Sequence, residues 1–169
     1  IINTQKETGL IWNAEQTPAE SCSPKLARKD KKEFKNIFAQ GSEDSWYYTS
    51  MLTDPAEDIP FAKRTAIEEE ILPLFSGGTV YRMYIYDKRP NLDATAKFVQ
   101  RMMQNTKIPY TDLAITLSNC PVCKKSFPGA HEQCPQCGGE TTIYDRIVGY
   151  YRPRSRVNKG RLQEIENRN

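Results

Sequence analysis

Apolar spacing in the middle of the chain predicts two helices, each followed by a strand. From Pro60 to the Gly77-Gly78 break, apolar residues recur every three or four positions, as on one face of a helix: Ala62, Ala66, Ile67, Ile71 and Leu74. Residues 79–87 alternate as in a strand, with three side chains predicted to point inward: Val80, Met83 and Ile85. A second helix starts at Asn91 or Asp93, with four inward residues: Ala94, Phe98, Val99 and Met102. Residues 108–117 then read as a second strand, so the order predicts an α/β fold rather than a helical bundle.

The flanking segments carry weaker patterns. Residues 1–16 are expected to form a strand or loop, and the lysine-rich run 24–40 to form a solvated helix. Its apolar positions have a rough helical spacing: Leu26, Phe34, Ile37 and Phe38. Near the C-terminus, residues 141–148 look extended, and a short helix is expected after Asn158.

The stretch TPAES, Thr17 to Ser21, has the pattern of a helix start. Thr17 can cap the helix, Pro18 suits its first position, and Glu20 completes a capping box. Such a start offers free backbone N–H groups to an anion such as phosphate. A capped helix without a ligand is the simpler interpretation of these residues.

Composition limits the choice of protein class. The chain has 169 residues, 38% hydrophobic residues and a net charge of +3, which is too small to indicate a nucleic-acid partner by itself. No stretch resembles a signal peptide or a transmembrane segment. Paired cysteine turns suit a reducing compartment better than a disulfide framework, so a cytoplasmic location without a membrane partner is expected.

Four cysteines form two C-x-x-C turns separated by ten residues: Cys120, Cys123, Cys134 and Cys137. Two such turns can bring four thiolates to one tetrahedral zinc ion, at about 2.3 Å. An iron–sulfur cluster is the alternative, since thiolates serve both. A site with four protein ligands is closed, which predicts a structural role. His131, the only histidine, is expected to be a bystander.

The segment after the cysteines is rich in arginine. Together with a zinc ribbon, these basic residues suggest a nucleic-acid-binding module as one alternative, although no reading helix is evident. Gly149, within RIVGYY, is explained most simply by backbone freedom in a turn. A second interpretation is a backbone radical, because a glycine α-carbon can flatten and share its unpaired electron with the adjacent amide groups.

The order of these motifs resembles one family, the anaerobic (class III) ribonucleoside-triphosphate reductases, at their C-terminal end. The matching stretches are EQTPAES (15–21), DSWYYTSML (44–52), LFSGGTVYRMYI (74–85), NTKIPYTDLAITLSNCPVC (105–123), CPQCGG (134–139) and RIVGYYRPRSRVNKGRLQE (146–164). The cysteine turns followed by R-I-V-G-Y and N-K-G-R, in that order, are the most specific part.

The resemblance implies a glycyl radical enzyme that reduces ribonucleotides to deoxyribonucleotides. Gly149 would carry the radical, formed by a radical S-adenosylmethionine iron–sulfur activase. The radical would oxidise a cysteine to a thiyl that attacks the ribose. The backbone around TPAES would meet the phosphates of the ribonucleoside triphosphate, at Thr17, Ala19, Glu20 and Ser21. The complete enzyme would be a homodimer.

The same resemblance implies how the chain is divided. Residues 1–118 would be the C-terminal part of a ten-stranded α/β barrel, 119–140 a zinc ribbon, and 141–169 the glycyl radical loop and tail. The catalytic cysteines of the family lie upstream of TPAES, and Cys22 matches neither, so it is interpreted as structural. Three arrangements follow: a fragment of a full reductase, the smaller subunit of a split enzyme, or a stand-alone spare part that docks on a damaged enzyme.

Overall fold

The computed structural model describes residues 1–16, 21–49, 51–85, 90–147 and 149–168. The chain divides into two compact units. The first unit consists of Ile1–Thr17, Ile59–Met83 and Leu92–Asp112. The second unit consists of Pro18–Asp58, Tyr84–Asn91 and Leu113–Asn169.

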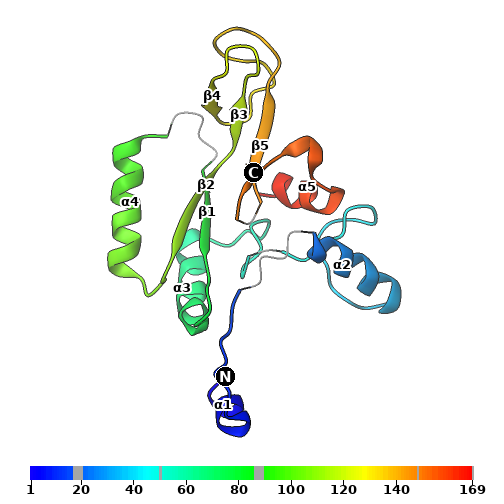
Figure 1. Cartoon of the computed structure of the whole chain (residues 1–169), viewed down its shortest axis with the longest axis vertical. Coiled ribbons are helices and arrows are strands. Elements are labelled where there is room, and N and C mark those ends of the chain that lie inside the picture. Colours follow the sequence, from blue (N-terminus) through cyan, green and yellow to red (C-terminus); the bar gives the residue numbers. More distant parts are fainter. Residues whose placement is uncertain (17–20, 50, 86–89, 148, 169) are drawn as a thin grey trace. The chain divides into compact units, whose positions relative to one another are not determined.

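The first unit contains the two predicted helix–strand pairs. Its helices are α1 (Ile2–Thr8), α3 (Phe61–Ile71), the 3-10 turn η1 (Leu72–Leu74) and α4 (Leu92–Asn105). Strands β1 (Tyr81–Ile85) and β2 (Thr111–Ile115) form a two-stranded sheet, labelled in Figure 1. The unit boundary falls within these two strands. The predicted mixed α/β character is confirmed.

The predicted inward face of α3 is largely wrong, and that of α4 is correct at Met102 but not at Ala94 or Phe98. The buried residues of α3 are Thr65 and Glu68, whereas most of the predicted apolar face is exposed, including Leu74 at 70%. Thr65 can be buried because its hydroxyl hydrogen-bonds to the Tyr81 hydroxyl at 3.0 Å. In α4 only Met102 is buried among the residues described. Both helices therefore present apolar side chains to solvent, which helical periodicity alone cannot distinguish from a core face.

Strand β1 also differs from its predicted pattern. Tyr81 and Arg82 are its buried residues, rather than Val80, Met83 and Ile85. The Arg82 Nε lies 2.8 Å from the Asp112 Oδ2, and this ion pair allows the charge to be buried.

The N-terminal segment contains a helix, which corrects the expectation of a strand or loop. Helix α1 has no buried residue, so it lacks the apolar period by which a helix is recognised. It ends at Gly9, whose φ of 68° is left-handed and whose N–H donates to the Gln5 carbonyl. This glycine C-cap is a local stabilising feature that does not depend on a core.

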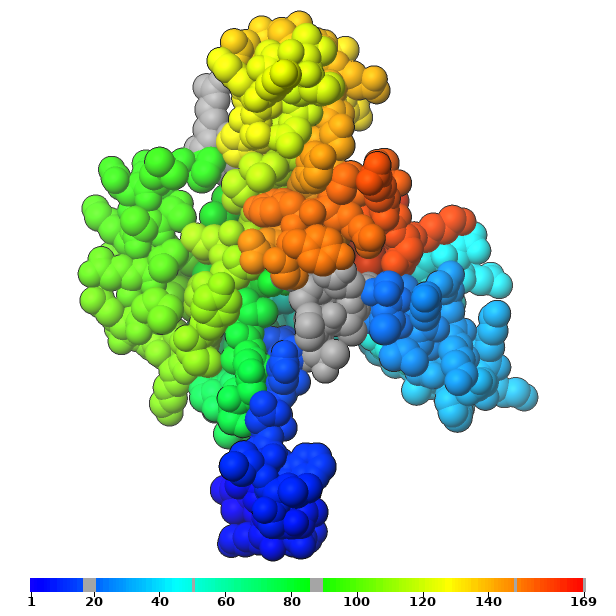
Figure 2. Space-filling model, viewed as in Figure 1, coloured from blue at the N-terminus to red at the C-terminus, as the bar shows by residue number. Residues whose placement is uncertain are grey.

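The second unit is built on an antiparallel sheet in the order β4-β3-β5-β6. Its strands are β3 (Leu117–Asn119), β4 (Ser126–Pro128), β5 (Thr142–Arg146) and β6 (Tyr151–Pro153). The remaining elements are α2 (Cys22–Glu33), the 3-10 turn η2 (Arg154–Arg156) and α5 (Lys159–Glu166). In Figure 2 the orange and red C-terminal segment packs against the yellow strands of this unit. The predicted helix after Asn158 is confirmed, with Asn158 as its N-cap.

Helix α2 packs through small residues rather than through the predicted apolar positions. Ser23, Pro24 and Ala27 are buried, whereas Leu26, at 51%, is exposed. A β-carbon on Gly160 of α5 would lie 2.8 Å from the Pro24 β-carbon, so the two helices meet at van der Waals contact. The close approach of α2 and α5 requires small residues at their contact, so the larger apolar residue Leu26 of α2 faces away from it. Within the described ranges, no helix is long and apolar enough to cross a membrane.

Candidate functional site

The four paired cysteines converge on one point in the second unit. Their sulfur atoms, those of Cys120, Cys123, Cys134 and Cys137, all lie within 4.8 Å of one another. The Cys120 and Cys137 sulfurs are 3.5 Å apart, and those of Cys123 and Cys134 are 3.6 Å apart. No disulfide is formed among these cysteines.

Local backbone geometry forms each cysteine turn. Lys124 follows the first pair in the left-handed conformation, with φ 57°, and Gly138 follows the second pair with φ 72°. The Cys120 N–H donates to the Lys125 carbonyl at 2.9 Å, and the Cys134 N–H donates to the Gly139 carbonyl at 2.7 Å. Each turn is thus closed by its own hydrogen bonds, independently of the rest of the chain.

Backbone amides also favour a negative charge on the cluster. Burial opposes ionisation of Cys134, but N–H groups of Cys137 and Gln136 point at its sulfur and lower its pKa to about 6. Burial raises the pKa of Cys123 to about 12, and hydrogen bonding to the Cys134 sulfur adds to this rise.

The donor set fits a zinc ion. Four thiolates in two closed turns provide a complete tetrahedral shell, which leaves no position for a substrate. Among the His, Cys, Asp and Glu side chains of the described residues, one group could hold a metal, namely these four cysteines. The His131 Nε2 lies 3.0 Å from the Pro128 carbonyl oxygen, consistent with its predicted bystander role.

Gly149 lies in the connection between β5 and β6. Arg146 pairs with Tyr151, and the Ile147 N–H donates to the Tyr150 carbonyl at 3.1 Å, so the chain reverses around this glycine. Gly149 is exposed, and among the described residues other than its chain neighbours, no heavy atom lies within 4 Å of the place where a β-carbon would be. The α-carbon is thus accessible, and packing does not exclude a side chain there.

The predicted phosphate site falls largely outside the described residues. Thr17, Ala19 and Glu20 belong to that undescribed stretch, and Ser21 is the N-cap of α2. The predicted capping box, with Thr17 as the cap and Glu20 three residues later, lies outside the described residues, and the Ser21 side chain makes no capping hydrogen bond. Cys22, the first residue of α2, is exposed and lies outside the metal cluster.

The arginines of the C-terminal segment are mostly engaged inside the second unit. Arg154 contacts both carboxylate oxygens of Asp145, at 2.7 and 3.0 Å, and these hydrogen bonds raise the pKa of the Arg154 guanidinium. Arg161 and Arg168 both pair with the fully buried Glu164. Their spacing of three and four residues from Glu164 along a helix was the sequence signal for this network. These pairings weigh against the nucleic-acid-binding alternative, because Arg161 and Arg168 are buried and Arg154, whose side chain is 31% exposed, is paired with Asp145.

Comparisons with known proteins agree on one family. The family described as anaerobic ribonucleoside-triphosphate reductase matches residues 1–169. A solved structure described as an anaerobic ribonucleotide reductase is 25% identical with a TM-score of 0.78, and the match covers 99% of this chain and 26% of that one. The anaerobic ribonucleotide reductase from Thermotoga maritima, solved with dATP and CTP, is 24% identical with a TM-score of 0.72, over 96% of this chain and 26% of that one. The chain thus spans about a quarter of the length of these structures, and no curated protein matches it.

Proposed function

Because the chain belongs to the anaerobic ribonucleoside-triphosphate reductase family, we propose that it is the part of such a reductase that carries the glycyl radical. The complete enzyme reduces ribonucleoside triphosphates to deoxyribonucleotides, with the catalytic cysteines outside these 169 residues. The observation that carries this proposal is the open turn at Gly149, which follows the four-cysteine cluster in the same sheet.

The surroundings of Gly149 suit a backbone radical. Loss of the α-hydrogen requires the α-carbon to become planar, and a glycine has no side chain to oppose this. The empty space around the position of a β-carbon leaves room for a reaction partner to approach. Other residues of the turn, by contrast, are held by hydrogen bonds such as that from Ile147 to Tyr150.

The proposed reaction is a series of hydrogen-atom transfers that pass the radical from the activase to Gly149, then to a cysteine, and then to the ribose. An activase of the radical S-adenosylmethionine class removes a hydrogen atom from the Gly149 α-carbon. The glycyl radical then takes a hydrogen atom from a cysteine thiol elsewhere in the reductase, which restores the glycine and leaves a thiyl. The thiyl takes the 3′-hydrogen of the ribose, the 2′-hydroxyl leaves as water, and an external reductant, formate or a thiol protein, supplies two electrons. Return of the 3′-hydrogen regenerates the thiyl, which takes the glycine hydrogen again, so Gly149 stores the radical between turnovers.

The four-cysteine cluster has a structural role in this proposal. Strand β3 leads into Cys120, and β5 begins after Cys137 and runs to the Gly149 turn. A zinc ion at the cluster would join the ends of these two paired strands. The strand that carries the turn is thereby fixed at its far end.

The remaining reductase would supply what the chain lacks. In the first unit, large apolar side chains are exposed that a self-contained domain would bury, among them Leu74 at 70% and Leu92 at 77%. We assign these side chains to the interface with the rest of the α/β barrel, in the same polypeptide or in a separate subunit. The triphosphate of the substrate is proposed to meet the start of α2 near Ser21, where backbone N–H groups lack helical partners.

The proposal is tested by Gly149→Ala in the complete reductase. Anaerobic incubation with activase, S-adenosylmethionine and a reductant should give a glycine-type doublet in the electron paramagnetic resonance spectrum of the wild type. The variant should lose the doublet and all turnover. Since an alanine β-carbon meets no atom at this position, its zinc content and thermal unfolding should match those of the wild type.

A doublet that persists in Gly149→Ala would contradict the assignment to this residue. A wild type that binds zinc, accepts the activase and never gives a doublet would contradict the proposed function as a whole. Ser155→Ala, at an exposed position of the same C-terminal segment, provides the control and should retain the doublet.

A further inference from the structure

We propose that Arg168 is a positioning residue for the Gly149 turn, an inference that rests on the proposed function. It follows from the way the strand before the glycine is held. Three consecutive residues, Asp145, Arg146 and Ile147, each contact a different part of the C-terminal segment. Gly149 follows two positions later, with no atom near its α-carbon on the side-chain side.

The first contact holds Asp145. Its carboxylate accepts two hydrogen bonds from the Arg154 guanidinium and one, at 2.7 Å, from the Thr116 hydroxyl. Paired hydrogen bonds between a guanidinium and a carboxylate fix orientation as well as distance. The Asp145 side chain is 5% exposed, so water competes little for these bonds.

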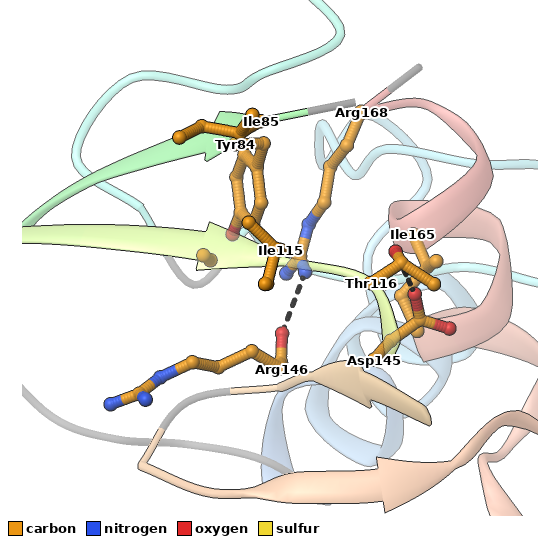
Figure 3. A pocket seen from close by; sticks show the side chains of 9 residues that line it. Tyr84, Ile85, Ile115, Thr116, Asp145, Arg146, Ile165 and Arg168 are labelled. Carbon is orange, nitrogen blue, oxygen red and sulfur yellow. Dashed lines mark hydrogen bonds between the residues drawn. The ribbon is translucent and has the colours of Figure 1, made fainter. Parts of the chain in front are cut away.

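The second contact holds the backbone of Arg146. The Arg168 Nη1 donates to the Arg146 carbonyl oxygen at 3.1 Å, shown as a dashed line in Figure 3. A main-chain contact of this kind fixes the path of the strand itself rather than one of its side chains.

Arg168 is in turn held on two sides. Its Nη2 lies 3.2 Å from the Oε1 of Glu164, a carboxylate that also pairs with Arg161. The Arg168 guanidinium carbon lies 4.4 Å from the centre of the Tyr84 ring, and Figure 3 shows the two side chains next to each other. The guanidinium is therefore confined between an anion and an aromatic face while it reaches the strand.

The third contact is apolar. Ile147, 2% exposed, packs in one cluster with Ile165 of α5, and the partly buried Val157 packs against both. Arg154 of η2, Ile165 of α5 and Arg168 after that helix thus form a clasp, defined by these three residues, over residues 145–147. The clasp ends where the glycine turn begins.

In this arrangement residues 145–147 are held in place, while the Gly149 α-carbon that follows them is exposed. Hydrogen-atom transfer depends steeply on the distance between the reacting atoms, so a small displacement of the turn is costly. A turn anchored through residues 145–147 can present its α-carbon first to the activase and then to the cysteine. Arg168 acts on this chemistry through the Arg146 carbonyl and touches no reacting atom.

The test compares Arg168→Met with Arg156→Met in the complete reductase. Arg168→Met keeps the aliphatic stem and removes the guanidinium, and Arg156, which is exposed in the same segment, is the matched control. In Arg168→Met, hydrogen exchange at residues 147–150 should speed up about tenfold or more, because one anchoring hydrogen bond to a charged group is lost. The glycyl doublet should fall several-fold in yield or lifetime while the zinc content is unchanged. Arg168→Lys, which keeps the cation beside Glu164, should restore part of the doublet.

The outcomes separate this inference from the proposed function. If the wild type gives a doublet and Arg168→Met matches Arg156→Met in exchange, yield and lifetime, the positioning role is wrong and the radical assignment stands. If the wild type gives no doublet, the proposed function fails, whatever the exchange data show. If Arg168→Met loses zinc or fails to fold, Ile165→Val decides instead. Faster exchange with a weaker doublet supports the clasp, and unchanged values for both contradict it.

Discussion

Two glycines of the second unit differ in what surrounds them. A β-carbon at Gly149 would meet nothing within 4 Å, whereas at Gly160 it would lie 2.7 Å from the Trp46 carbonyl oxygen and 2.8 Å from the Pro24 β-carbon. Gly160 is therefore required by packing. At Gly149 no described residue beyond its chain neighbours sets such a requirement, which agrees with the radical role proposed above for its α-carbon.

Gly160→Ala should destabilise the protein by about 1–3 kcal/mol, because the methyl group overpacks the contact between α5 and α2. This cost exceeds the gain of about 1 kcal/mol that alanine brings to a helix. Urea denaturation followed by circular dichroism measures the difference. Gly149→Ala is the matched comparison, with an expected change within about 0.5 kcal/mol. Equal stabilities for the two variants would show that the close approach at Gly160 is not rigid.

Single residues were predictable where their role depends on near neighbours in the sequence. The spacing of the four cysteines alone predicts a metal site, and the structure brings their sulfur atoms together. Arg168 could not be assigned in this way, because its contacts with Tyr84 and the Arg146 carbonyl depend on how distant segments fold. The burial of Glu164 could not be predicted from the sequence either, since a Glu in a charged tail is normally solvated.

Elements were predicted better than their orientations. Helices α3, α4 and α5 and strands β1, β2 and β5 occur where periodicity and turn residues placed them. Met102 of α4 is buried as predicted, but most of the predicted inward face of α3 is exposed, because helical spacing identifies an apolar face without specifying what covers it. Helix α1 was missed because it has no such face.

The stability of the cysteine turns and of the strands that they join should depend on bound zinc, and these segments should lose their structure together when it is removed. We expect one zinc per chain by elemental analysis, and removal by a chelator should raise hydrogen exchange throughout residues 117–146. Cys137→Ser should have the same effect, since three thiolates leave the tetrahedron open. Cys22→Ser is the matched control, because Cys22 lies outside the cluster. Iron with sulfide, rather than zinc, would identify an iron–sulfur cluster instead.

At the scale of the whole molecule, the chain corresponds to about a quarter of a solved anaerobic ribonucleotide reductase. The first unit buries a threonine and a glutamate of α3 while large apolar residues remain at its surface, as expected if the rest of the proposed reductase covers them. The exposed residues on and beside its helices include Phe61, Ile71, Leu74, Leu92 and Phe98. In the proposed enzyme these residues are interior, so changes to them should have different effects in the chain and in the complete reductase.

Leu74→Lys tests this difference. In the 169-residue chain Leu74 is 70% exposed, so the substitution should change the free energy of unfolding by no more than about 0.5 kcal/mol. In the complete reductase it would place a charge where a leucine is buried, with a loss of about 2 kcal/mol or more and a lower yield of active enzyme. Glu70→Lys, an exposed position on α3, is the control and should leave both proteins unchanged. Thermal unfolding of each variant in the chain and in the complete reductase provides the measurement. If Leu74→Lys were as harmless in the complete enzyme as in the chain, this surface would not be the interface with the rest of the barrel.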